Sequence, residues 1–209
     1  MNKEKKVINF YLLCNKLKNV IRTGWIDWNV QRNRVESIAE HVYGVQMLAL
    51  AIYNEYKYKL DIQKVIYMLA IHEIGETIIG DLTAFDISKE EKVKKEHEAV
   101  HRILSEMLDA KEIEDLFLEF DAHETAEAKF AYQCDKLECD IQCKIYDEEK
   151  CVDITKQDGN KSFTNGEVKE LLESNKSWSQ MWLEYGRNHY PYDENFISIS
   201  KFIEENDIL

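Results

Sequence analysis

The scarcity of turn-forming residues is the feature of this sequence that most constrains its fold. The 209 residues include only one proline and seven glycines. Because proline and glycine are the residues that most often form turns and interrupt helices, their scarcity favours long helices over many short strands. Apolar residues at helical spacing recur along most of the chain. The sequence therefore predicts an all-α fold, a helical bundle in which residues 1–209 form a single domain.

The composition is typical of a soluble globular protein with an acidic balance. Hydrophobic residues make up 44% of the chain, and 27 basic against 40 acidic residues give a net charge of −13. That charge disfavours nonspecific binding to a nucleic acid polymer. No apolar run has the length of a membrane span, and the Lys-rich N-terminus has no signal-peptide pattern. The five cysteines contain no CxxC motif, so we expect reduced thiols and a cytoplasmic protein.

Helix signals divide the chain into a series of predicted helices. Ser37 and Glu40 fit a capping box, Asp61 can cap the next helix, and Gly80 is a candidate stop. An irregular loop is expected over residues 22–30 and a second loop over 81–86, and the tail from Tyr190 is left unassigned. The expected helices span residues 5–20, 37–56, 61–80, 88–108, 111–120, 124–148, 165–174 and 178–186.

One of these predicted helices carries charges where a core helix would carry apolar side chains. His72, Glu73 and Glu76 stand in an otherwise apolar segment. Burying unpaired charges costs several kcal/mol, roughly, unless something compensates them. A divalent cation can do so, because it binds imidazole and carboxylate together. His72 and Glu76 are four residues apart and share one face of the predicted helix, so this segment is predicted to form one wall of a metal site.

The other walls are expected from two further helices. His41 lies in the first turns of the helix that begins after Ser37, and Asp135 lies in the middle of the helix predicted over 124–148. The set His41, His72, Glu73 and Asp135 offers nitrogen and oxygen ligands to one divalent ion. Such a mixed set suits Mn²⁺, Co²⁺, Fe²⁺, Ni²⁺ or Zn²⁺.

Other charged positions have a simpler interpretation as solvated surface. His97 and His101 are four residues apart in a helix rich in Lys and Glu, and we expect that face to be exposed. The lysines that alternate with glutamate in the same helix are expected to form an ordinary exposed surface: Lys92, Lys94 and Lys95.

Four ordered motifs resemble the HD-domain metal-dependent phosphohydrolases, over roughly residues 10–150. They are Arg22–Trp25 with Asn29-Val30, Glu36–His41, Ala70–Glu76 with Gly80–Thr83, and Ala126–Phe130 leading to Asp135. Within that family the chain resembles the group of the bacterial 5′-deoxynucleotidase YfbR and the eukaryotic HD domain-containing protein 2. One departure is clear: the family's His-Asp pair is His72-Glu73 here. Glutamate is one methylene longer, so ligation would need a shifted helix or rotamer.

The resemblance implies a role for each matching residue. The metal ligands would be His41, His72, Glu73 and Asp135. Glu76 would orient or deprotonate the attacking water, which agrees with general-base chemistry. Asp81 would contact substrate and assist proton transfer, and Arg22 would orient the phosphate. The expected substrate-binding residues are Arg22, Trp25, Glu73, Asp81, Leu82, Thr83 and Ala84. For Trp25, a contact with sugar or base and a role as a core anchor both stay open.

The expected activity is that of a metal-dependent phosphomonoesterase acting on nucleoside 5′-monophosphates. The preference for 2′-deoxy substrates is implied only by the resemblance. Alternatives are hydrolysis of another phosphoester, such as guanosine tetraphosphate or a cyclic nucleotide, and a non-catalytic module that binds metal or nucleotide. The family tends to pair subunits, and the aromatic residues Trp178, Trp182 and Tyr185 could offer an apolar surface. We therefore expect a homodimer.

Overall fold

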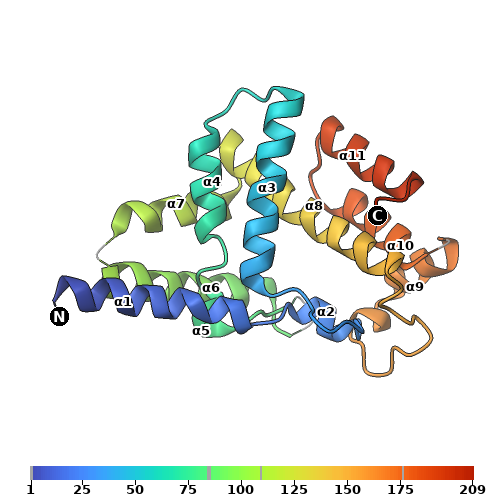
Figure 1. Ribbon diagram of the computed structural model, residues 1–209, viewed down its shortest axis with the longest axis horizontal. Helices are drawn as coiled ribbons and strands as arrows, with labels where there is room; N and C mark the ends of the chain where they lie inside the picture. The colour runs from blue at the N-terminus through green and yellow to red at the C-terminus, as the bar shows by residue number, and fades with distance from the viewer. Residues whose placement is uncertain (1, 84–85, 109, 176) are drawn as a thin grey trace. The chain divides into compact units, whose positions relative to one another are not determined.

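The protein is all-α, as the sequence predicts, in a computed structural model that describes residues 2–83, 86–108, 110–175 and 177–209 (Figure 1). Apart from one isolated bridge, between Ile21 and Ser37, the regular elements of these ranges are helices. The α-helices are α1 (Lys3–Cys14), α2 (Thr23–Asp27), α3 (Ile38–Tyr56), α4 (Ile62–Ile71), α5 (Glu76–Ile79), α6 (Lys89–His101), α7 (Lys111–Ala122), α8 (Ala126–Glu148), α9 (Gly166–Ser174), α10 (Trp178–His189) and α11 (Glu194–Glu205). Shorter segments are the 3₁₀ helices η1 (Asn15–Asn19) and η3 (Ser162–Thr164) and the π-helical η2 (Arg102–Leu108).

The contacts within the chain define two compact units. Unit 1 consists of Met1–Thr23 and Glu36–Tyr132, and unit 2 consists of Gly24–Val35 and Gln133–Leu209. Helix α8 begins in unit 1 and continues into unit 2. The organisation of residues 1–209 as a single domain stays a prediction. None of the helices in the described ranges has both the length and the apolar character needed to cross a membrane.

In unit 1, α3 and α4 run side by side (Figure 1). The predicted capping box at the start of α3 is confirmed, because the Glu40 N–H donates to Ser37 Oγ while the Ser37 N–H donates to Glu40 Oε2 at 2.9 Å. Asp61 accepts two backbone N–H groups and caps α4, as predicted. Both caps satisfy N–H groups that a helix cannot pair internally. They determine where each helix begins, and so where His41 and His72 lie.

The continuous helix predicted over residues 61–80 is wrong, because the chain turns in its middle. Helix α4 ends at Ile71, and the N–H groups of Ile74 and Glu76 donate to carbonyls three residues back, at 2.9 and 3.1 Å, before α5 begins. Ile71 and Ile74 on either side of His72 are buried in the same apolar cluster. A Cβ on Gly75 would lie 3.6 Å from the Glu96 Cα, so the turn packs closely against α6. Burial of the two isoleucines therefore outweighs helical continuity.

The loop predicted over residues 22–30 is also partly wrong, because Thr23–Asp27 form the short helix α2. Just before α2, the Arg22 N–H donates to the Glu36 carbonyl at 3.1 Å, and the Ile38 N–H donates to the Val20 carbonyl at 2.9 Å. These bonds hold the backbone of Arg22 beside the start of α3.

Unit 2 has an aromatic core. The Trp25 ring lies 5.3 Å from that of Tyr146, and Trp25, Trp28 and Trp178 are each almost fully buried. Trp182 packs against the same cluster. Each buried ring removes a large apolar area from water. Of the three C-terminal aromatic residues, Trp178 is therefore buried within unit 2, whereas Trp182 and Tyr185 are only partly buried. The homodimer stays a prediction.

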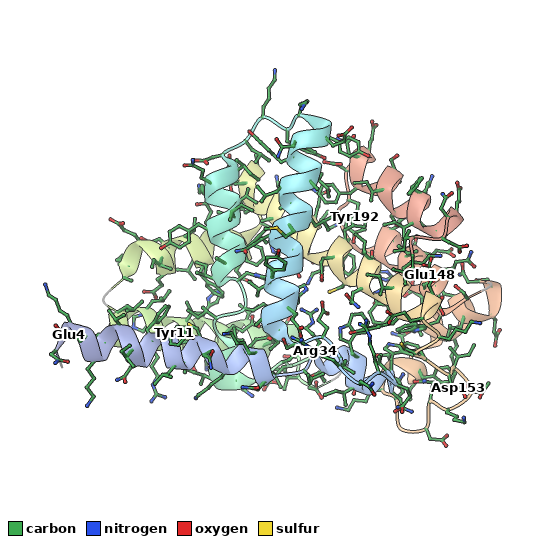
Figure 2. All side chains as sticks on the ribbon, viewed as in Figure 1. Glu4, Tyr11, Arg34, Glu148, Asp153 and Tyr192 are labelled. Atoms are coloured by element: carbon green, nitrogen blue, oxygen red, sulfur yellow. The ribbon has the colours of Figure 1, made fainter. Side chains whose placement is uncertain are left out.

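The C-terminal segment, left unassigned from the sequence, is tied to α8 within unit 2. It forms α11, and Glu148 at the carboxyl end of α8 (Figure 2) accepts the N–H groups of Ile208 and Leu209 at 3.0 Å. The Nζ of Lys144 lies 3.1 Å from Oε1 of the same glutamate. The two backbone hydrogen bonds therefore attach the last residues to α8.

His97 and His101 lie on the surface, as predicted, with side chains 38% and 65% exposed, but each has a carboxylate partner that the sequence did not indicate. His97 Nε2 lies 2.7 Å from Asp121 Oδ2, and His101 Nδ1 lies 2.8 Å from Glu114 Oε1, both on α7. These exposed histidines therefore also link α6 to α7 within unit 1.

Replacing Gly186 should destabilise unit 2. A Cβ at this position of α10 would lie 2.5 Å from Asp140 Oδ2, and Asp140 is fully buried and accepts a hydrogen bond from Tyr192. Because the carboxylate would have to shift and disturb its hydrogen bond with Tyr192, we expect Gly186→Ala to lower the free energy of unfolding by about 1–3 kcal/mol. Urea denaturation measures the change. Gly166→Ala is the matched control, because a Cβ added there meets open space, and it should leave the free energy of unfolding unchanged. Equal stability of the two variants would contradict the prediction.

Candidate metal centre and active site

Three of the four predicted metal ligands meet in unit 1. His41 Nε2 lies 3.9 Å from Glu73 Oε1, and His72 Nε2 lies 3.6 Å from the same oxygen. Ligand atoms of the three side chains all lie within 4.8 Å of one another. His41 comes from α3, and the other two come from the turn after α4. The cluster can therefore hold a divalent metal ion through two imidazoles and a carboxylate.

The orientation of His72 fits ligation by Nε2. Its Nδ1 lies 2.8 Å from the carbonyl oxygen of Leu69. A carbonyl can only accept a hydrogen bond, so Nδ1 carries a proton, and in the neutral ring Nε2 presents its lone pair toward Glu73. A lone pair facing a carboxylate oxygen is unfavourable unless a cation lies between them. This hydrogen bond is the outer contact that commonly orients a metal-binding histidine.

Glu73 lies between the histidines and the single arginine of the site. Arg22 Nη1 lies 3.6 Å from Glu73 Oε1, and both side chains are mostly buried. Glutamate in place of the family's aspartate therefore does not turn to solvent, because its carboxylate faces His41, His72 and Arg22. The guanidinium of Arg22 is the part of this group that could bind an anion.

Glu76, at the start of α5, is a buried carboxylate with only 3% of its side chain exposed. Its Oε2 accepts no hydrogen bond from the residues that the structure describes. Burial, followed by the negative charges of Glu73 and Asp81, raises the pKa of Glu76 well above its usual range, while Lys92 and Arg22 act in the opposite direction. A carboxylate with a raised pKa and an unused oxygen has the character of a general base.

Asp81 follows α5 and is fixed to the segment that carries Arg22. The Thr23 N–H donates to Asp81 Oδ2 at 2.6 Å, and the Thr23 hydroxyl donates to the Asp81 carbonyl at 2.7 Å. Gly80 makes this possible, because its φ of 75° turns the chain out of α5. Asp81 is therefore more than a helix stop, since it joins two segments of the site.

The other residues predicted to bind substrate are Leu82, Thr83, Ala84 and Trp25. Leu82 is half-buried, and the N–H and hydroxyl of Thr83 both donate to Asp86 Oδ2, so Thr83 belongs to a local turn. Ala84 lies outside the described residues. Trp25 is 2% exposed in the aromatic core of unit 2, which supports its role as a core anchor. A contact between Trp25 and substrate stays a prediction.

Asp135 lies just beyond the point at which α8 passes from unit 1 into unit 2. Its carboxylate is 2.9 Å from the ammonium of Lys136. Its membership of the metal set stays a prediction.

Lys92 is the residue of the site that the sequence analysis missed. It was assigned to the exposed surface of α6, yet its Nζ lies 3.7 Å from Glu76 Oε1 and 3.5 Å from Glu96 Oε1. Its spacing from Glu96, four residues along the helix, was visible in the sequence. Nothing local indicated that the same face meets Glu76.

Comparison with known proteins identifies the family of this chain. A family model for the HD domain matches residues 14–185. The chain therefore belongs to the HD-domain family and is a phosphohydrolase by class.

Among its relatives are enzymes named for one reaction. The human 5′-deoxynucleotidase HDDC2 is 35% identical over 148 residues, which cover 69% of this chain and 70% of that protein. The Dictyostelium discoideum 5′-deoxynucleotidase HDDC2 is 33% identical over 150 residues, or 68% and 78% of the two chains.

Solved structures share the fold. A Pyrococcus horikoshii protein superposes with a TM-score of 0.63 at 22% identity, covering 95% of this chain and 98% of that one. A predicted metal-dependent phosphohydrolase from Magnetospirillum magnetotacticum has a TM-score of 0.59 at 22% identity, with coverage of 96% and 94%. At this identity the likeness concerns the fold alone.

Proposed function

We propose that this protein is a divalent-metal-dependent phosphomonoesterase that hydrolyses deoxynucleoside 5′-monophosphates to nucleoside and phosphate. The observation that carries the proposal is the meeting of His41, His72 and Glu73 beside Arg22 in unit 1. The relatives named 5′-deoxynucleotidases support the choice of substrate.

The ligand set we propose is His41, His72, Glu73 and Asp135, which suits Mn²⁺, Co²⁺, Fe²⁺, Ni²⁺ or Zn²⁺. Asp135 is included because its carboxylate is of the right type and the resemblance to the family matches it to a ligand. When bound, a divalent cation polarises a phosphate oxygen and lowers the pKa of a coordinated water.

The protein's own residues bind the phosphate and transfer the protons. Arg22 orients the phosphate through its guanidinium, since this group can bind two phosphate oxygens at once. Glu76 accepts the proton of the attacking water on a buried carboxylate oxygen. Asp81, held in place by Thr23, contacts the substrate and assists proton transfer to the leaving nucleoside.

The test is release of phosphate from dAMP, dCMP, dGMP and dTMP, and from the four ribonucleotides, with Mn²⁺ or Co²⁺ present. We expect turnover that is lost after treatment with a chelator and restored by adding metal. Hydrolysis of deoxynucleotides in preference to ribonucleotides would establish the sugar preference. The absence of turnover with every nucleotide would remove the substrate assignment.

A non-catalytic metal-binding module is the competing candidate, because the longer Glu73 replaces the family's aspartate. Such a module would bind metal with no turnover of any nucleotide, guanosine tetraphosphate or cyclic nucleotide. Because both candidates bind metal, turnover measured on a preparation whose metal content has been verified separates them.

A further inference from the structure

We propose that Lys92 is a positioning residue for the reaction, holding the Glu76 carboxylate in place and itself held by Glu96. The proposal rests on the proposed function, in which Glu76 is the general base. It concerns a residue of α6 to which the resemblance assigns no role.

The geometry forms a chain of three charged groups. Lys92 Nζ lies 3.7 Å from Glu76 Oε1 on one side and 3.5 Å from Glu96 Oε1 on the other. Only Glu76 Oε1 is engaged in this way, while Oε2 has no hydrogen-bond partner in the described part of the chain. Oε1 is thus paired with the ammonium of Lys92, and Oε2 can accept a proton from water.

The close approach of α5 to α6 brings these groups together. The backbone at Gly75 packs against Glu96, whose carbonyl would lie 3.5 Å from a Cβ at position 75. Glu76 follows immediately, so its side chain meets the turn of α6 that carries Lys92. A cation beside a carboxylate with 3% exposure offsets part of the cost of burying its charge, and Lys92 and Arg22 both act on Glu76 in this way.

A second pair on the same helix shows that Lys92 differs from an ordinary surface lysine. Lys94 and Glu98 have the same spacing as Lys92 and Glu96, but they lie 4.0 Å apart and their side chains are 77% and 68% exposed. The Lys92 side chain is only 30% exposed. Exposed pairs of this kind contribute little, whereas a lysine against a buried carboxylate restrains both side chains.

Charges around Glu76 make the role measurable. Burial and the negative charges of Glu73 and Asp81 raise the pKa of Glu76, whereas the positive charges of Lys92 and Arg22 lower it. The ammonium of Lys92 stays charged, because the pKa of Lys92 is itself raised by the surrounding carboxylates despite the opposing effect of burial. Removing this charge should therefore raise the pKa of Glu76, and the base would be deprotonated only at higher pH.

The experiment compares Lys92→Met, which keeps an unbranched apolar side chain and removes the ammonium, with Lys92→Arg and with Lys94→Met as the matched control. Each variant is assayed as the metal-loaded protein, with phosphate release followed against pH. For Lys92→Met we expect kcat to fall roughly 10-fold or more, KM and metal content to change little, and the acidic limb of the pH profile to move to higher pH. Lys92→Arg should recover much of the loss, and Lys94→Met should behave as the unaltered protein.

The two ways of failing are distinct. An active unaltered protein whose Lys92→Met variant keeps its kcat and pH profile would overturn the role of Lys92 alone. A loss of kcat in Lys92→Met with an unchanged pH profile and no recovery in Lys92→Arg would also overturn it, since that indicates a general structural defect. An unaltered protein that binds metal but turns over no nucleotide would overturn the proposed function, and this role with it.

Discussion

Replacing Glu76 with glutamine should abolish turnover while leaving metal binding intact. The amide is nearly isosteric with the carboxylate but cannot accept a proton, so kcat should fall about 10²- to 10⁴-fold. Glu76 is not among the atoms that meet at the metal cluster, so metal content should be unchanged. Steady-state phosphate release and elemental analysis of the same sample measure the two quantities.

Glu98→Gln is the control for this prediction, because Glu98 lies on exposed α6 surface and undergoes the same chemical change. It should retain full activity. If Glu76→Gln kept the kcat of the unaltered protein, Glu76 could not be the base. If it lost the metal as well, Glu76 would be a ligand and the division of roles proposed for the site would be wrong.

Replacing His41 with asparagine should remove the metal and, with it, the activity. His41 is fully buried and its Nε2 faces Glu73, so the shorter amide cannot reach the position of the imidazole nitrogen. We expect metal affinity to fall by at least about 100-fold, more than the loss typical of an altered outer contact. A metal that binds only the folded protein stabilises it by about 2.7 kcal/mol at a hundred times its Kd. Thermal unfolding with and without added Mn²⁺ therefore reports binding independently of turnover.

The matched control is His97→Asn, because His97 lies in the same unit but pairs with Asp121 away from the cluster. Its unfolding should respond to Mn²⁺ as that of the unaltered protein does. A full metal response in His41→Asn would show that His41 is not a ligand. Folding of the variant is checked by its helical circular dichroism in the absence of metal.

Much of the fold follows from local chemistry that a sequence displays. The capping box of Ser37 and Glu40, the Asp61 cap and the stop at Gly80 depend only on neighbouring residues, and the sequence predicted all three. Histidine and glutamate in an apolar segment indicated a compensating cation for a similar reason, since the cost of burying charge does not depend on the fold. Local signals failed where packing decided the outcome, as in the turn at residues 72–75.

The sequence alone predicts an all-helical protein with His41, His72, Glu73 and Asp135 as candidate ligands, because composition, caps and residue types are properties of the chain itself. Only the tertiary structure decided that α4 ends before Glu76, that Trp25 is buried among other aromatic rings, and that Lys92 meets a buried carboxylate. Helical periodicity states which residues share a face, but what lies opposite that face depends on contacts between residues far apart in the sequence.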